Sequence, residues 1–161
     1  MGQLGDATVF ASETCALDIV GAKAIRDVAP GEIITIDRDG MRSMMPFAPV
    51  PATRCVFEYV YFARPDSSIF GGSVDRARRA LGRRLAIEAP ALGADLVFAV
   101  PDSSNAAALG YAEQSGLRLE HALIRNHYIG RTFIQPTQSG RDAKVRVKYN
   151  AVREVLEGKS V

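Results

Sequence analysis

Residues 96–111 carry the pattern that most restricts the fold of this chain. The run from Leu96 to Val100 is short, apolar and continuous, which is typical of a strand covered on both faces in a parallel sheet. Pro101 ends this strand, and the alanine-rich residues that follow predict a helix that stops at Gly116. The segment therefore predicts a strand, a short turn and a helix.

The turn between this strand and this helix is polar. It consists of Asp102, Ser103, Ser104 and Asn105, and all four residue types favour the N-terminus of a helix. In α/β proteins, a polar loop between a parallel strand and a helix N-terminus is where anions and phosphates bind. The loop is therefore a candidate phosphate site. Capping of the helix alone would also explain these residues, and the loop chemistry does not separate the two interpretations.

The first fifty residues predict a β-rich, antiparallel region. The clearest element is a hairpin, in which residues 32–37 and 41–45 are the strands and Asp39-Gly40 is the turn. Upstream, residues 7–12 are strand-like, and residues 13–24 predict a short helix or loop. The residues expected to pack this short segment are Leu17, Ile19 and Val20.

Three prolines interrupt the chain after this hairpin, at Pro46, Pro49 and Pro51. Proline cannot donate the backbone hydrogen bond that a central strand or a helix interior needs, so residues 47–53 are expected to form neither element. We therefore place a domain boundary in this stretch, with one domain at residues 1–50 and a second at residues 51–161.

The second domain begins with a predicted strand at residues 54–62, which are rich in Val, Phe and Tyr. A helix capped by Ser73 is predicted over residues 74–88. Its buried stripe is expected to contain Val74, Ala77, Leu81 and Leu85. Together with residues 96–116 and a short predicted strand at residues 121–124, these elements alternate as in a parallel α/β sheet.

Residues 125–140 follow no helical or strand period. A loop of this length inside a compact α/β domain is more often functional than idle. Residues 141–157 allow two interpretations, a helix or a strand. The residues that fit a helix are Val152, Val155 and Leu156, and those that alternate with basic residues as in a strand are Val145, Val147 and Tyr149. The sequence leaves this choice open.

The formal charge of the 161-residue chain is +2, which gives no indication of nucleic acid or an acidic membrane as a partner. No apolar run approaches the length of a membrane span. The two cysteines, Cys15 and Cys55, lie far apart in a chain without secretory features, which favours a reducing, cytoplasmic compartment.

Four stretches are specific enough to compare with known families. They are residues 11–18 (ASETCALD), residues 55–67 (CVFEYVYFARPDS), residues 100–104 (VPDSS) with residues 110–112 (GYA), and residues 125–136 (RNHYIGRTFIQP). These stretches resemble the amidophosphoribosyltransferases, glutamine-dependent enzymes that convert phosphoribosyl pyrophosphate to phosphoribosylamine at the start of purine synthesis. The resemblance implies the end of an N-terminal-nucleophile glutaminase domain in residues 1–50 and the first part of a type I phosphoribosyltransferase domain in residues 51–161.

The resemblance also implies roles for two loops. In this family, ammonia released from glutamine passes through an internal channel and displaces pyrophosphate from C1 of the ribose. Asp102, Ser103 and Ser104 would form the pyrophosphate loop, with Ser103 next to a Mg²⁺ ion that neutralises the leaving group. A lid would close over bound substrate and exclude water. Its working residues would be Tyr128, Ile129, Gly130, Arg131 and Thr132.

Some members of the family hold a 4Fe–4S cluster, and Cys55 matches the position of one cluster ligand. A cluster needs four thiolates, and a packed core cysteine on an apolar strand is an equal alternative for Cys55. The resemblance further implies glutamine and phosphoribosyl pyrophosphate as substrates, purine nucleotides as feedback ligands, and a homo-oligomer.

Two parts of the family pattern are not among these 161 residues: the nucleophilic cysteine of the glutaminase and the paired aspartates that hold the ribose hydroxyls. We therefore expect an internal fragment without catalytic residues of its own, and no phosphoribosylamine formation by this chain alone. Two alternatives stay open. One is another type I phosphoribosyltransferase, such as a salvage enzyme, against which residues 1–50 argue. The other is a non-catalytic nucleotide-binding module.

Overall fold

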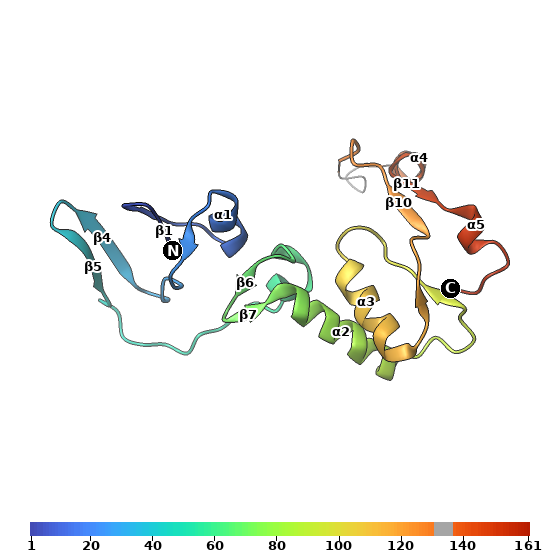
Figure 1. The fold of residues 1–161 in the computed structure, drawn as a ribbon, viewed down its shortest axis with the longest axis horizontal. Coiled ribbons are helices and arrows are strands. Elements are labelled where there is room, and N and C mark those ends of the chain that lie inside the picture. Colours follow the sequence, from blue (N-terminus) through green and yellow to red (C-terminus); the bar gives the residue numbers. More distant parts are fainter. Residues whose placement is uncertain (131–136) are drawn as a thin grey trace. The chain divides into compact units, whose positions relative to one another are not determined.

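A computed structural model describes residues 1–130 and 137–161 of the chain (Figure 1). The described residues form two compact units, Met1–Val74 and Asp75–Val161. Both units mix helices and strands, as the sequence predicts. The first unit extends beyond residue 50, where we place the domain boundary, and that boundary stays a prediction.

The first unit begins with a small antiparallel sheet. Its strands are β1 (Gly2–Leu4), β2 (Ala7–Val9) and β3 (Lys23–Ala24), in the spatial order β2-β1-β3. Helix α1 (Thr14–Ile19) lies between β2 and β3 in the chain, and it buries Leu17. Strand β2 therefore lies within the strand predicted at residues 7–12, and α1 lies within residues 13–24, for which the sequence predicts a short helix or a loop.

The packing predicted for this helix is partly wrong. Ile19 and Val20 are exposed, so Leu17 is the only one of the three predicted packing residues that is buried. The physical reason is that the helix ends at Ile19, and the chain then turns back through Gly21, which has a φ of +73°. Residues at the end of so short a helix point to solvent rather than into a core.

The predicted hairpin is confirmed. Strands β4 (Ile33–Asp37) and β5 (Gly40–Met44) pair antiparallel in a register that places Asp37 opposite Gly40. Gly40 has a φ of +115°, which a residue with a side chain rarely adopts. The Asp37 carboxylate accepts a hydrogen bond of 2.9 Å from the backbone N–H of Asp39, and this local bond stabilises the turn.

The strand predicted at residues 54–62 is wrong. Residues Glu58–Phe62 form a single π-helical turn, η1, in which the Ala63 N–H donates to the Glu58 carbonyl at 3.1 Å. Aromatic and β-branched residues favour a strand only where a neighbouring strand supplies hydrogen bonds. Here the backbone groups are instead satisfied within the segment, as in other single-turn π-helices.

A second hairpin follows η1. Strands β6 (Ser68–Ile69) and β7 (Gly72–Ser73) pair antiparallel, and the Tyr59 hydroxyl donates a hydrogen bond of 2.6 Å to the Ile69 carbonyl. A Cβ atom at Gly72 would lie 2.8 Å from the Tyr59 hydroxyl, so this glycine admits the aromatic side chain. Tyr59, which lies in the strand predicted at residues 54–62, therefore packs on this hairpin instead.

Helix α2 (Val74–Glu88) has the predicted bounds, and it packs against α3 (Asn105–Ser115) (Figure 1). Two glycines bring the helices together. A Cβ atom at Gly82 would lie 1.9 Å from the Ala107 carbonyl oxygen, and one at Gly110 would lie 2.0 Å from a backbone oxygen of α2. No residue with a side chain fits at either position without a shift of the backbone.

The buried face of α2 differs from the predicted stripe. Val74 is buried, but Leu81 and Leu85 are 47% and 52% exposed. The buried positions recur every four residues and are Val74, Arg78, Gly82 and Ala86. Because α3 approaches most closely where there is no side chain, the contact stripe is centred on the glycine rather than on the leucines.

Strand β8 (Leu96–Val97), helix α3 and strand β9 (Arg118–Leu119) form a βαβ unit with parallel strands. This confirms the predicted order of strand, turn and helix. Gly116 has a φ of +75° and ends α3, as predicted. The strand is shorter than the predicted run to Val100, because β9 pairs with two of its residues only.

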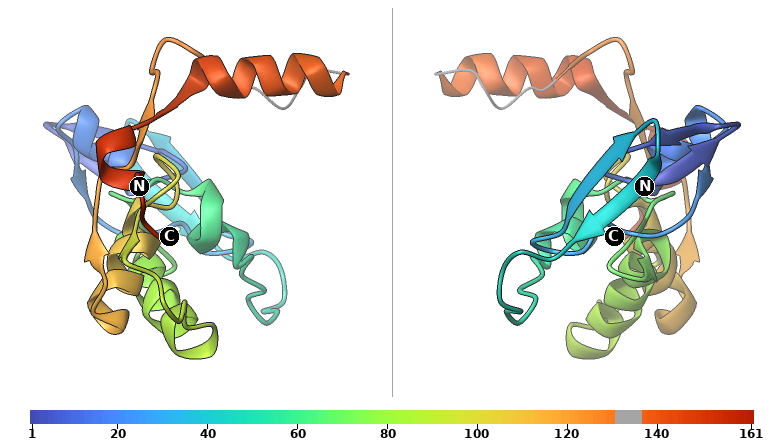
Figure 2. Two further views of the ribbon diagram at one scale, coloured as in Figure 1. Left: turned by 90° about the vertical axis from the view of Figure 1, so that its right-hand side faces the viewer. Right: turned by 90° about the vertical axis from the view of Figure 1, so that its left-hand side faces the viewer.

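The second unit ends with a strand pair and two helices. Strand β10 (Leu123–Arg125) overlaps the strand predicted at residues 121–124 and pairs antiparallel with β11 (Tyr149–Ala151). Helix α4 (Gln138–Lys148) precedes β11 and α5 (Arg153–Leu156) follows it, so the segment that the sequence leaves open contains both helix and strand. Figure 2 shows α4 standing out from the rest of its unit. No helix of the described residues is long and apolar enough to cross a membrane.

Candidate phosphate-binding site

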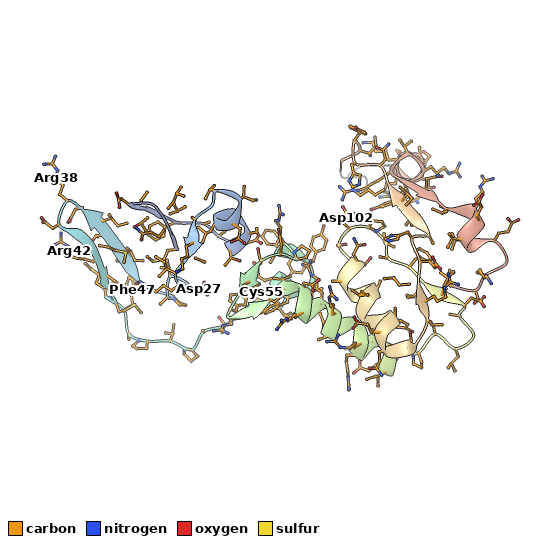
Figure 3. All side chains as sticks on the ribbon, viewed as in Figure 1. Asp27, Arg38, Arg42, Phe47, Cys55 and Asp102 are labelled. Atoms are coloured by element: carbon orange, nitrogen blue, oxygen red, sulfur yellow. The ribbon has the colours of Figure 1, made fainter. Side chains whose placement is uncertain are left out.

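The candidate loop connects β8 to α3 at the carboxyl end of a parallel strand (Figure 3). Asp102 and Ser103 are exposed, and Ser104 is half-buried. Ser104 occupies the N-cap position of α3, but its hydroxyl donates a hydrogen bond of 2.6 Å to the Val100 carbonyl and does not cap the helix. Side-chain capping therefore does not explain the serine at this position.

The first turn of α3 leaves donors available. The Asn105 N–H donates to the Asp102 carbonyl at 3.3 Å, and the Ala108 N–H donates to the Ser104 carbonyl at 2.8 Å. Between them, the N–H groups of Ala106 and Ala107 have no backbone acceptor among the described residues. These free N–H groups and the positive end of the helix dipole make the loop suitable for an anion.

Two residues on neighbouring strands hold this loop. Arg125 on β10 and Tyr149 on β11 lie opposite each other in the register of the strand pair. The Arg125 guanidinium forms an ion pair with the Asp102 carboxylate, and the Tyr149 hydroxyl donates a hydrogen bond of 3.2 Å to the Pro101 carbonyl. The loop is therefore attached to the two strands that flank residues 126–148.

Within the described part of the chain, one of the two exposed polar residues of the loop is paired and the other is free to bind a ligand. Asp102 is paired with Arg125, whereas the Ser103 hydroxyl has no hydrogen-bond partner among the described residues. A partly exposed pair of this kind stabilises by at most about 1 kcal/mol. Mg²⁺ in enzymes is usually held by one or two protein oxygens together with substrate phosphates. The Asp102 and Ser103 oxygens fit an ion that arrives with a phosphate ligand.

No larger metal site is built into the described part of the chain, because residues 1–130 and 137–161 contain no cluster of three or more His, Cys, Asp or Glu side chains that could hold a metal ion. Cys55 is exposed and precedes η1 (Figure 3). Its interpretation as a core residue on an apolar strand is wrong, because that strand does not form. Cys15, the other cysteine of the chain, is buried. A 4Fe–4S cluster needs four thiolates, so the residues of this chain alone do not fit one.

The predicted lid residues are described in part. Tyr128 is 98% exposed, Ile129 is half-buried and Gly130 is exposed. Arg131 and Thr132 lie outside the described residues. The Asn126 side-chain oxygen accepts a hydrogen bond of 3.0 Å from the Tyr128 N–H, which shapes the start of this segment. The role of these residues as a lid stays a prediction.

Sequence reasoning did not single out the two residues that hold the loop. Arg125 was noted only as the first residue of a family-like stretch. Tyr149 lies in the segment whose conformation the sequence leaves open, and its alternation with Val147 and Val145 was the available signal for a strand. A pairing between β10 and β11 would have placed Tyr149 opposite Arg125.

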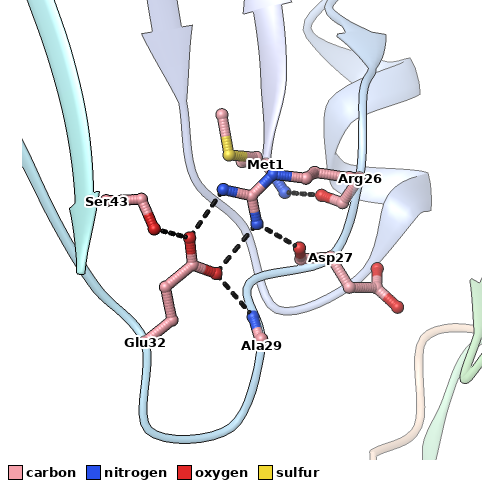
Figure 4. A network of polar contacts seen from close by, with 6 residues as sticks. All are labelled: Met1, Arg26, Asp27, Ala29, Glu32 and Ser43. Atoms are coloured by element: carbon pink, nitrogen blue, oxygen red, sulfur yellow. Dashed lines mark hydrogen bonds and ion pairs between the residues drawn. The ribbon is translucent and has the colours of Figure 1, made fainter. Parts of the chain in front are cut away.

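A second polar cluster, in the first unit, surrounds Glu32 (Figure 4). Its carboxylate accepts hydrogen bonds from the Arg26 guanidinium at 2.6 and 2.8 Å, from the Ser43 hydroxyl at 2.5 Å and from the Ala29 N–H at 2.8 Å. The bonds from Arg26, followed by those from Ser43 and Ala29, lower the pKa of Glu32 to about 2. The Glu32 side chain is only 4% exposed, and it ties the strands of the first hairpin to residues 26–29.

The fold and the loop define the class of protein. The second unit is an α/β unit in which a polar loop lies between a parallel strand and a helix, the arrangement of phosphate-binding α/β proteins. No protein-family model matches the chain. Along nearly its whole length, however, the chain is homologous to the amidophosphoribosyltransferases.

The amidophosphoribosyltransferase of Mycobacterium tuberculosis H37Rv is 54% identical over 159 residues, which are 99% of this chain and 30% of that protein. The enzyme of Bacillus subtilis is 52% identical over 161 residues, 100% of this chain and 34% of that protein. The chain thus spans about a third of the length of these relatives. The resemblance stated from the four sequence stretches is confirmed.

Solved structures agree with these relatives. One, described as the allosteric regulatory enzyme of purine biosynthesis, matches with a TM-score of 0.87 and 52% identity over 99% of this chain and 34% of that chain. Another, glutamine phosphoribosylpyrophosphate amidotransferase from B. subtilis complexed with ADP and GMP, matches with a TM-score of 0.86 and 52% identity over 99% of this chain and 35% of that chain.

Proposed function

We propose that this chain is part of an enzyme that transfers ammonia from glutamine to 5-phosphoribosyl 1-pyrophosphate. The products are 5-phosphoribosylamine, glutamate and pyrophosphate, and the reaction is the first step of purine synthesis. The observation that carries this proposal is the identity of 52–54% to amidophosphoribosyltransferases along 99% or more of the chain. The free donors of the loop before α3 support it chemically.

The two halves of this reaction are assigned to the two predicted domains. Residues 1–50 are the end of the glutaminase domain, in keeping with their antiparallel strands. Residues 51–161 are the first part of the type I phosphoribosyltransferase domain, in keeping with the parallel βαβ unit.

In the proposed site, Asp102, Ser103 and Ser104 form the loop that holds the pyrophosphate group. The backbone N–H groups of Ala106 and Ala107 and the hydroxyl of Ser103 donate to its oxygens, and Arg125 keeps Asp102 in place. A bound Mg²⁺ next to Ser103 would neutralise the charge of the leaving pyrophosphate. The Ala106 and Ala107 N–H groups belong to the first turn of α3 and have no backbone acceptor among the described residues, which supports a loop that needs little reorganisation to bind an anion.

The remaining assignments also follow the family. Residues 128–132 are proposed as the lid that excludes water, and Cys55 as one ligand of a 4Fe–4S cluster whose other thiolates lie outside this chain. Purine nucleotides are proposed as feedback ligands, since a B. subtilis relative is described in complex with ADP and GMP. We further propose a homo-oligomer in the cytoplasm, where the free thiols of Cys15 and Cys55 would stay reduced.

The test is an assay of the protein expressed from the complete gene. Purified protein with Mg²⁺ and phosphoribosyl pyrophosphate should form phosphoribosylamine from glutamine, and the variant Ser103→Ala should reduce kcat/KM for phosphoribosyl pyrophosphate about tenfold, because a hydrogen bond to a charged group is lost. Ser115→Ala is the matched control. Its hydroxyl lies at the other end of α3, where it accepts from the Leu117 N–H at 3.3 Å.

Two results would contradict the proposal. Consumption of phosphoribosyl pyrophosphate with a purine or pyrimidine base, but not with glutamine, would identify a salvage phosphoribosyltransferase. Binding of phosphoribosyl pyrophosphate without turnover would identify a non-catalytic module.

A further inference from the structure

A set of polar contacts in the first unit joins the N-terminus of α1 to the segment before β6. The Glu13 carboxylate accepts a hydrogen bond of 2.8 Å from the Arg64 N–H and another of 2.8 Å from the Ser67 hydroxyl. The neighbouring Thr14 hydroxyl accepts a hydrogen bond of 2.8 Å from the Ser68 N–H. We call these five residues the clasp.

The clasp is more than an incidental surface contact. Its hydrogen bonds join residues that are 51 and 54 positions apart in the chain. Ser67 is 2% exposed and Glu13 and Thr14 are half-buried, whereas Arg64 and Ser68 are exposed. The bond between Ser67 and Glu13 is therefore the one that water replaces least readily. One carboxylate also receives both a backbone and a side-chain donor, and charged acceptors make the stronger hydrogen bonds.

The segment on the donor side is shaped to present its donors. The Ser67 N–H donates to the Arg64 carbonyl at 3.0 Å, which closes a turn, and the Arg64 guanidinium binds the Asp66 carboxylate at 2.7 and 3.0 Å. The Ser67 carbonyl then accepts from the N–H of Val74, the first residue of α2, at 3.0 Å. The clasp therefore determines where the chain lies relative to α1 just before α2 begins.

We propose that the clasp couples the two half-reactions, with Glu13 and Thr14 acting as positioning residues. This inference rests on the proposed function, in which Glu13 and Thr14 belong to the glutaminase part and Arg64, Ser67 and Ser68 to the phosphoribosyltransferase part. Ammonia is small and uncharged, so it escapes wherever the two parts separate. A clasp between them keeps released ammonia inside the protein until it reaches the ribose.

The test compares three rates in the protein expressed from the complete gene: phosphoribosylamine formation with glutamine, the same reaction with added ammonium, and glutamine hydrolysis. In Glu13→Ala and in Ser67→Ala, the glutamine-dependent rate falls about tenfold, within the range that a small misplacement far from the chemistry produces. The ammonium-dependent rate and glutamine hydrolysis change less than about twofold, because neither requires transfer between the parts.

One control variant and one pair of variants at Thr14 sharpen the test. Ser68→Ala removes a hydroxyl that donates to the Gly72 carbonyl at 3.3 Å but keeps the N–H that binds Thr14, so it leaves all three rates unchanged. Thr14→Val removes the acceptor hydroxyl and uncouples the reactions, whereas Thr14→Ser keeps the hydroxyl and restores coupling.

Three outcomes would overturn the inference. Equal falls in all three rates would show that the clasp supports only the fold. Unchanged rates in both Glu13→Ala and Ser67→Ala would show that the clasp does not act in transfer. If the unmodified protein forms no phosphoribosylamine from either nitrogen source, the proposed function itself fails, and the coupling role fails with it.

Discussion

Tyr149 holds the candidate loop through a single hydroxyl. Its hydrogen bond of 3.2 Å to the Pro101 carbonyl fixes the backbone just before Asp102 and Ser103, while the aromatic ring is half-buried in the second unit. Arg125, its cross-strand neighbour, fixes Asp102 by charge. Both residues hold the loop without themselves belonging to it.

We expect Tyr149→Phe to raise KM for phosphoribosyl pyrophosphate about fivefold, because one hydrogen bond of about 1 kcal/mol that orders the loop is lost. The ring remains, so kcat should change less than KM. Tyr61→Phe is the control, since the Tyr61 ring packs against Phe57 at 5.5 Å and its hydroxyl has no hydrogen bond among the described residues. An unchanged KM in Tyr149→Phe would exclude this role.

The carboxylate of Glu32 should make the stability of the protein depend on pH. Its pKa is lowered from 4.5 to about 2 by the bonds from Arg26, Ser43 and Ala29. A lowered folded-state pKa contributes stability above pH 4.5, and this contribution is lost as the pH falls toward 2. The thermal midpoint of the unmodified protein should therefore approach that of Glu32→Gln across this interval. Glu157→Gln, at an exposed position, should follow the unmodified protein, and parallel curves for Glu32→Gln would contradict the assignment.

At the scale of elements, the packing of α2 on α3 depends on the absence of two side chains. A Cβ atom at Gly82 would lie 1.9 Å from the Ala107 carbonyl oxygen, well inside van der Waals contact. Helix propensity alone favours alanine over glycine by about 1 kcal/mol. The steric clash would lower the stability of a Gly82→Ala variant and the helix propensity would raise it, so this single substitution shows which effect is larger.

We expect Gly82→Ala to destabilise the protein by about 1–3 kcal/mol, measured as a fall in the midpoint of thermal or denaturant unfolding, because an overpacked helix contact must separate. Arg84→Ala, at an exposed position of α2 whose side chain pairs with Glu88, should change stability by less than about 0.5 kcal/mol. A gain in stability for Gly82→Ala would mean that the helices do not approach as closely as described.

Some elements could be predicted from residues that are neighbours in the sequence, and others could not. The first hairpin and the bounds of α3 were predicted because their turn residues, Gly40 and Gly116, adopt positive φ angles that few other residues tolerate. The strand predicted at residues 54–62 failed because a strand exists only through its partners. The prediction of the buried face of α2 was wrong because the spacing of hydrophobic residues does not indicate where the backbone of α3 approaches the helix.

At the scale of the whole molecule, much apolar surface stays uncovered in this chain. In the second unit, a hollow of about 320 Å³ is lined mainly by apolar residues, among them Leu85, Phe98, Tyr111, Leu117 and Val161. In the first unit, Phe47 and Val50 are largely exposed. Contiguous apolar surface of this kind favours association with other apolar surfaces.

We expect the 161-residue chain, expressed alone, to enhance the fluorescence of an apolar dye such as anilinonaphthalene sulfonate and to elute as larger species in gel filtration. The protein expressed from the complete gene should do neither to the same extent, because its relatives are about three times as long and a longer chain buries a larger fraction of its surface on folding. A monodisperse 161-residue chain that does not enhance the dye fluorescence would show that the exposed apolar surface does not drive association.

The sequence by itself determined the local elements and the family resemblance: the strand, polar turn and helix around Asp102, the first hairpin, and the stretches shared with amidophosphoribosyltransferases. These depend on residues within a few positions of one another. Only the tertiary structure decided that Arg125 and Tyr149 hold the loop, that Gly82 sets the contact of α2, and that Glu13 binds Ser67. The partners in these contacts lie 23 to 54 positions apart, and no local propensity specifies which distant residue the folded chain will bring near.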